Sequence, residues 1–246
     1  MAYETLNAGS GPGGSYEAGD SWTPEIGSQA RANFTDHETR LLTAEAALVV
    51  AQAAIAALQA VPPPGTTLLY TATASGVANL DIVTRNATGQ SGAIFQTDYD
   101  EYVIECVGVL PATDGQTLDL RVSIDGGSSF VSSSSYAHAR QFVNHSGTAA
   151  AAGSSSATQV IVGGGYENTI GDGGGHSTIR ILNPLTDVQR KSIYGQGTTR
   201  ASDGIHYGLV FYGWYLANNP VNAIRLLMSS GNIAHMQTRV YGFRKS

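Results

Sequence analysis

The chain has 246 residues, which is enough for one large domain and a smaller segment. It contains 30 glycines, and only 13% of its residues are charged, which suits a β-protein with many turns. The formal net charge of −6 argues against a nucleic-acid-binding protein. Cys106 is the only cysteine, so it can form neither an intrachain disulfide nor a thiolate cluster with a metal. We expect it to be a small buried residue of the core.

The first 22 residues are rich in glycine and serine and carry the aromatic residues Tyr3, Tyr16 and Trp22. Such a segment cannot bury a core by itself. Two interpretations are open: a disordered tail, or a flexible arm whose aromatic side chains dock on another protein. The segment lacks the basic and apolar regions of a secretory signal peptide, and we expect none. The longest apolar stretch, residues 44–58, is too short and too rich in alanine to insert into a membrane.

A helix is predicted over residues 23–61. Thr23, followed by Pro24, is one possible start, because proline is favoured at the first helical position. Thr35 and Glu38 have the spacing of a capping box and mark a second possible start. The regular part of the helix is expected to begin at the second of these.

Heptad spacing of apolar residues predicts that this helix is a coiled-coil stalk. Large side chains recur every seven residues, and the positions three further along carry histidine, alanine or leucine. The expected contacts between copies are made by Phe34, Leu41, Leu48, Ile55 and Leu58. Packing against the rest of the chain is the alternative, and the pattern alone does not define the number of helices. His37 at an inner position could bind an anion or sense pH, or lie in a solvated first turn.

Three prolines at 62–64 end the helix, and residues 62–66 are predicted to form an extended proline hinge. After the hinge the apolar period changes to two, as where Leu118, Leu120 and Val122 alternate with polar residues. Similar runs predict strands at 67–74, 93–97, 101–110, 118–124, 178–182, 205–216, 221–229 and 237–243. Many short strands without intervening helices predict a β-sandwich or barrel head over residues 67–246. Residues 132–135 and 146–158, rich in serine and alanine, are expected to be flexible.

The predicted strand 205–216 is apolar on both of its faces. Leu209 and Phe211 belong to one face, and Tyr212 and Trp214 belong to the other. One face can fill the core of a sandwich, and the other needs a second cover, for which a neighbouring subunit is suitable.

Two segments of the head resemble a known family. They are PATDGQTLDLRVSIDGGSSF at 111–130 and AIRLLMSSGNIAHMQTRVYG at 223–242. Both are similar to segments of tail-fibre and receptor-binding proteins of tailed bacteriophages. A departure is His235-Met236, where the family frequently has a glycine before the last strand. The resemblance covers residues 66–246 and concerns the head module, not its ligand.

The resemblance implies a homotrimeric fibre with an N-terminal virion-attachment arm, a coiled-coil stalk and a jelly-roll β-sandwich tip. Its N-terminal arm would contact other virion proteins through Tyr3, Tyr16 and Trp22, and its head would adsorb to host-surface polysaccharide. The protein would be a virion component assembled in the bacterial cytoplasm. The order of arm, heptads, prolines and strands along this chain matches that plan independently.

Several residues are weighed as chemical sites. Asp98, Asp100 and Glu101 could act as the acid and base of a glycan hydrolase or bind Ca²⁺, but a solvated turn is the simpler interpretation. The six histidines have no zinc-binding spacing, and no cofactor site is recognised. No arrangement of nucleophile and base is visible, so we expect no enzyme activity.

The longest glycine-rich stretch, residues 162–176, lacks the ending of a phosphate-binding loop. Tyr166, Asn168, Asp172 and His176 within it have the polar and aromatic character that suits sugars, and they are the predicted glycan-binding residues. A wide turn between strands is the alternative. The function favoured by the sequence is a phage fibre that binds a host glycan. A head or tail decoration protein without receptor role, and a capsule depolymerase, are the alternatives.

Overall fold

The computed structural model describes residues 35–37, 39–50, 52, 65–171 and 174–245. The chain divides into two compact units, Met1–Pro63 and Pro64–Ser246. The described residues of the first unit are all helical and exposed. Two threonine hydroxyls bond to the carbonyl oxygens one turn earlier: Thr39 to Thr35 and Thr43 to Thr39, each at 2.7 Å. Within the described residues, no helix is long and apolar enough to cross a membrane.

The helix exposes the apolar residues that the heptad pattern assigns to the seam. Leu41 and Leu48 are 63% and 58% exposed in the single chain. An apolar stripe of this kind stabilises a helix when it is covered. Self-association of the helix, which would cover this stripe, stays a prediction. The other predicted contacts, Phe34, Ile55 and Leu58, lie outside the described residues, as do the predicted anchoring residues Tyr3, Tyr16 and Trp22 and prolines 62–64.

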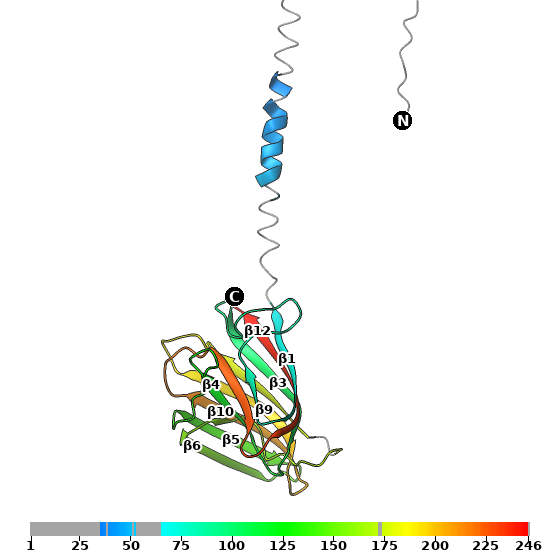
Figure 1. Cartoon of the computed structure of the whole chain (residues 1–246), viewed down its shortest axis with the longest axis vertical. Helices are drawn as coiled ribbons and strands as arrows, with labels where there is room; N and C mark the ends of the chain where they lie inside the picture. Colours follow the sequence, from blue (N-terminus) through cyan, green and yellow to red (C-terminus); the bar gives the residue numbers. More distant parts are fainter. Residues whose placement is uncertain (1–34, 38, 51, 53–64, 172–173, 246) are drawn as a thin grey trace, which may run out of the picture. The chain divides into compact units, whose positions relative to one another are not determined.

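The second unit consists of two antiparallel sheets, so the prediction of a mainly β head with a sandwich-like arrangement is confirmed (Figure 1). The larger sheet has the strand order β1-β12-β3-β8-β9-β10-β5-β6, and the smaller one has the order β2-β11-β4-β7. The strands of the larger sheet are β1 (Thr66–Val77), β3 (Tyr99–Pro111), β5 (Tyr136–Asn144), β6 (Ala149–Ala157), β8 (Gly175–Leu182), β9 (Lys191–Arg200), β10 (His206–Tyr215) and β12 (Ile233–Arg244). Those of the smaller sheet are β2 (Asn79–Ile82), β4 (Leu118–Ser123), β7 (Val160–Ile161) and β11 (Ala223–Met228).

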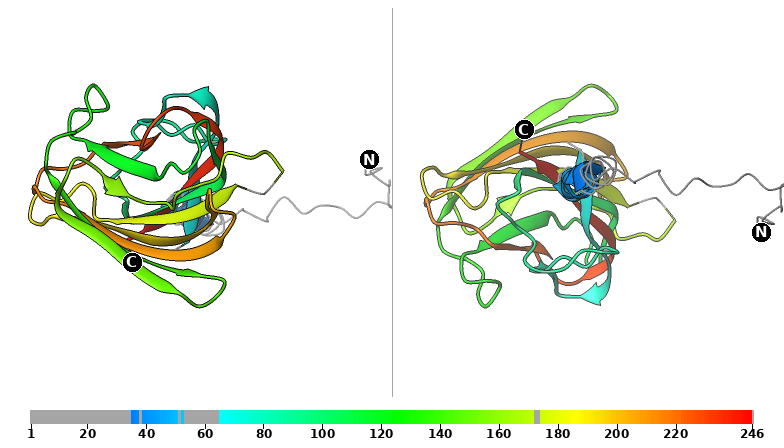
Figure 2. Two further views of the ribbon diagram at one scale, coloured as in Figure 1. Left: turned by 90° about the horizontal axis from the view of Figure 1, so that it is seen from below. Right: turned by 90° about the horizontal axis from the view of Figure 1, so that it is seen from above.

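The core lies between the facing sides of the two sheets, which form two layers in the end-on views of Figure 2. In β8, buried and half-buried residues alternate along the whole strand, as expected where only one side of a sheet faces the core. Leu118, Leu120 and Val122 of β4 are buried as predicted. The predicted alternation does not hold in full, because Asp119 and Ser123 on the other face are buried too and Ile124 is 41% exposed. Cys106 is also fully buried, and burial raises the pKa of its thiol to about 12.

The two faces of β10 have different environments. Leu209, Phe211 and Tyr215 are buried in the core, whereas Tyr212 and Trp214 are 50% and 41% exposed on the outer side. The prediction that only one face would fill the core is therefore confirmed for the single chain. What covers the outer face in an assembly stays a prediction.

Two predictions in the head are wrong. The alanine- and serine-rich stretch expected to be flexible forms β6, because its backbone pairs with β5 from Tyr136 to Val143. Backbone hydrogen bonds hold this edge strand although its side chains are small and exposed. The predicted strand at 93–97 is a loop, and its single bridge, between Thr84 and Ala93, lies outside the strands of either sheet. Its apolar residues reflect burial in the core, since Ile94 is fully buried there.

Candidate functional site

The glycine-rich stretch surrounds a buried tyrosine, which corrects one predicted site residue. Tyr166 is fully buried, and its hydroxyl lies 2.9 Å from Oγ of Ser177. Burial raises the pKa of this phenol above its ordinary value. A Cβ atom added to Gly175 would lie 1.7 Å from the Tyr166 ring, and one added to Gly163 would lie 2.3 Å from its hydroxyl oxygen. These glycines make room for the ring, so Tyr166 is a core residue and cannot contact a glycan.

The other predicted glycan-binding residues do not converge on one site. Asn168 is exposed, and its backbone N–H donates to Oδ1 of Asp114 at 3.2 Å. His176 is half-buried and lies next to Ser177 on β8, so the two side chains point to opposite sides of the sheet. Asp172 lies outside the described residues.

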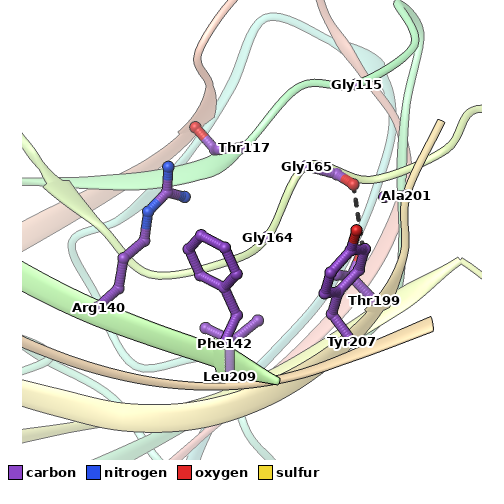
Figure 3. A pocket seen from close by; sticks show the side chains of 10 residues that line it. All are labelled: Gly115, Thr117, Arg140, Phe142, Gly164, Gly165, Thr199, Ala201, Tyr207 and Leu209. Carbon is purple, nitrogen blue, oxygen red and sulfur yellow. Dashed lines mark hydrogen bonds between the residues drawn. The ribbon is translucent and has the colours of Figure 1, made fainter. Parts of the chain in front are cut away.

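A pocket of about 250 Å³ lies on the inner side of the larger sheet, close to the same glycine-rich stretch (Figure 3). Strand β5 contributes Arg140 and Phe142 to it, and β10 contributes Tyr207 and Leu209. The remaining lining residues come from β9 and from the segments that face it: Gly115, Thr117, Gly164, Gly165, Thr199 and Ala201. The pocket is therefore built from segments far apart in the sequence, which the strand pairing brings together.

Close backbone packing forms one wall of this pocket. A Cβ atom on Gly164 would lie 2.4 Å from Cγ2 of Thr199, so only glycine lets this segment approach β9 so closely. The Thr199 hydroxyl donates to the carbonyl oxygen of Gly165 at 3.3 Å, the bond drawn in Figure 3. The adjacent Tyr166 N–H donates to the carbonyl oxygen of Gln116 at 2.9 Å. Gly164 and Gly165 thus line the pocket with backbone atoms. The hydrogen bonds to Thr199 on one side and to Gln116 on the other hold this segment in place.

Two aromatic rings form the apolar part of the pocket. Phe142 and Tyr207 lie edge to face, with ring centroids 6.1 Å apart and an angle of 87° between the planes. The pairing of β5 with β10 places Phe142 beside Leu209. The Tyr207 hydroxyl donates to Oδ2 of Asp203 at 3.0 Å, which holds the ring at the edge of the pocket. Aromatic faces next to polar groups are a suitable surface for a sugar ring, which has both apolar and hydroxyl-bearing sides.

Arg140 is the cation of the pocket. Its guanidinium carbon lies 5.7 Å from the centre of the Phe142 ring, and Figure 3 shows the guanidinium directed toward Thr117. Its Nε is buried and has no hydrogen-bond partner among the residues that the structure describes. Burial lowers the pKa of Arg140 from its ordinary value, while the nearby Asp119 acts in the opposite direction. A guanidinium remains charged at neutral pH, so this pocket contains a positive charge.

Asp119 lies behind the pocket in a polar network. It is 1% exposed, and it accepts hydrogen bonds from Thr117 Oγ1 at 2.8 Å and from Gln159 Nε2 at 2.5 Å. Arg121 donates from Nη2 to the other end of the Gln159 amide at 2.7 Å. Burial is the main cause that raises the pKa of Asp119 to about 7. The network fixes Thr117 at the wall of the pocket and keeps a titratable carboxyl near Arg140.

The carboxylates considered for glycan hydrolysis do not form a pair: one is bonded to an arginine, and two neighbours point to opposite sides of their strand. Glu101 forms an ion pair with Arg180 of β8. Asp100 and Glu101 are consecutive residues of β3, so their side chains point to opposite sides of the strand. Asp98 is exposed before the strand begins. Within the described part of the chain, no group of three or more His, Cys, Asp or Glu residues could hold a metal ion.

The sequence interpretation did not identify Arg140, Phe142, Thr199 or Tyr207. A signal was present in β5, where Tyr136, His138, Arg140 and Phe142 alternate with other residues and so share one face. A strand face that combines aromatic and basic residues is unusual for a simple core, but its position opposite the glycine-rich stretch depends on strand pairing. Comparison with known protein families found no family that matches the chain, and no curated protein matches it.

Proposed function

We propose that the chain is a fibre protein of a phage or phage-like particle and that its β-domain adsorbs to a host-surface glycan. The N-terminal arm anchors the protein to other virion proteins, and the helix joins three copies. The order of these segments in the sequence and the resemblance of residues 66–246 to phage receptor-binding proteins support this proposal. A jelly-roll connectivity, as in such heads, is compatible with the two antiparallel sheets.

The pocket between Phe142, Tyr207 and Arg140 is the observation that carries the glycan-binding part of the proposal. It offers aromatic surface, a charged donor and backbone of two glycines within one hollow of about 250 Å³. Binding sites for small polar ligands usually combine an apolar lining with a few directed polar groups. The pocket lies in the described part of the chain and does not depend on the arm or the helix.

An array of bacterial surface polysaccharides probed with the labelled full-length chain tests the proposal. We expect binding to a defined subset of these glycans, and we expect Tyr207→Ala to abolish it. Tyr212→Ala is the matched control, because Tyr212 lies on the same strand and is exposed on the opposite face. Binding that survives Tyr207→Ala but is lost in Tyr212→Ala would move the site to the outer face of the sheet.

The position on the particle needs a separate test. Antibody labelling of this chain on assembled particles, viewed by electron microscopy, is expected to mark fibres that project from the virion. A chain that binds no glycan on the array, and whose deletion leaves particle adsorption unchanged, would instead be a decoration protein. Label on the capsid surface without projecting fibres would give the same conclusion.

A further inference from the structure

We infer that the pocket selects anionic saccharides, with Arg140 pairing with a carboxylate or phosphate substituent of the sugar. This inference rests on the proposed function and names the class of glycan that the same pocket takes. Neutral saccharides of the same backbone should bind far more weakly.

The guanidinium of Arg140 has donors to spare. Its half-buried side chain contacts the Phe142 ring, and its buried Nε has no partner among the residues described. The other arginines on neighbouring elements are engaged: Arg121 bonds to Gln159, and Arg200 pairs with Glu167. Within the described residues no hydrogen bond or ion pair engages the Arg140 guanidinium, so its terminal N–H groups remain available to a ligand in the pocket.

Asp119 does not fill this role. Its carboxylate oxygens accept hydrogen bonds from Thr117 at 2.8 Å and from Gln159 at 2.5 Å, and among the described residues no hydrogen bond or ion pair joins Asp119 to Arg140. Burial raises the pKa of Asp119 to about 7, so near neutral pH a large fraction of it is uncharged. The positive charge of Arg140 is therefore only partly compensated within the protein. An anionic ligand gains from that charge without having to displace an existing ion pair.

The geometry favours an anionic group on a sugar ring that presents two oxygen atoms to the guanidinium. A guanidinium pairs with carboxylate and phosphate through two parallel N–H···O bonds, a match that a hydroxyl cannot make. Figure 3 shows Phe142 between Arg140 and Tyr207, so a sugar ring bound against Phe142 can direct its acidic substituent at the guanidinium. Carboxylates of uronic acids and phosphate groups share this chemistry, and the experiment separates them.

The test uses chemically matched polysaccharides and the full-length chain. Each acidic polysaccharide that binds on the array is compared with its carboxyl-reduced form, in which the uronate becomes a neutral hexose, or with its dephosphorylated form. We expect neutralisation to weaken binding about ten- to a hundredfold, the size of a lost hydrogen bond to a charged group. The form of neutralisation that has this effect identifies carboxylate or phosphate as the substituent.

Variants at Arg140 link this effect to the pocket. Arg140→Gln should weaken binding of the acidic form to the level of its neutralised form and leave the neutralised form unaffected. Arg140→Lys, which keeps the charge but loses the planar fork, should be intermediate. Arg239→Gln is the matched control, since Arg239 lies on the same sheet with its side chain half exposed beside Glu105. Circular dichroism of each variant confirms that the fold is retained.

The possible failures are distinct. Binding of neutral polysaccharides that Arg140→Gln leaves unchanged would overturn the inference and leave the proposed function in place. Equal binding of acidic and neutralised forms by the native chain would do the same. If no polysaccharide binds in either form, the proposed function itself fails.

Discussion

Raising the pH from about 5 to about 8 is expected to destabilise the β-domain through the ionisation of Asp119. Burial holds its pKa at about 7 in the folded chain, against an ordinary value of 3.8. Between these two values the folded state binds a proton that the unfolded state has lost, so stability falls as pH rises. At about 1.4 kcal/mol per pH unit, and less close to the folded pKa, the loss between pH 5 and pH 7 is about 2 kcal/mol, with little further loss above the folded pKa.

Urea unfolding of the full-length chain, followed by far-ultraviolet circular dichroism at a fixed chain concentration, measures this loss. Asp119→Asn is the reference, because the amide keeps the size of the side chain and cannot ionise. The difference between native and variant chains cancels other titrating groups, including His138, whose pKa is lowered mainly by burial and whose contribution has the opposite sign. A difference that stays constant across this pH range, or that favours the native chain at higher pH, would refute the reasoning.

Two further substitutions test the sheet and the helix. Gly195→Ala places a Cβ atom 1.9 Å from the carbonyl oxygen of Thr178, so we expect the unfolding free energy to fall by about 1–3 kcal/mol or more in urea titrations. Gly208→Ala, with no atom within 4 Å of its added Cβ, should cost much less, and equal losses would contradict the packing. Leu48→Asp should lower the oligomer mass measured by light scattering, whereas Val50→Asp, outside the predicted seam, should not. An unchanged mass in Leu48→Asp would show that the helix is not the assembling element.

Strong alternation made several elements of the head predictable. Leu118, Leu120 and Val122 indicated the buried face of β4, and the two apolar faces of the 205–216 run indicated β10. On the inner face of each strand local sequence and burial agree, because a strand against a core repeats every two residues. On the other face they do not: Asp119 of β4 is buried, and Trp214 of β10 is exposed. β6 was missed for the opposite reason. Alanine and serine carry little strand preference, and only pairing with β5 holds them in a strand.

The pocket was less predictable than the strands. Arg140 and Tyr207 are 67 positions apart in the sequence, and pairing between β5 and β10 brings their strands together. No local pattern contains that information. Two residues of the glycine-rich stretch, Gly164 and Gly165, line the pocket, but Tyr166, predicted to bind glycan, is a core residue. Glycine permits close approach of any neighbour, and at Gly163 and Gly175 that neighbour is the ring of Tyr166.

A structure of the full-length chain bound to an acidic oligosaccharide selected from the array tests the central claim most directly. We predict a sugar ring against Phe142 and Tyr207, with its acidic group within hydrogen-bonding distance of the Arg140 guanidinium. A saccharide bound on the outer face of the larger sheet, against Tyr212 and Trp214, would contradict the assignment of the pocket. An empty pocket at saturating oligosaccharide would contradict it equally.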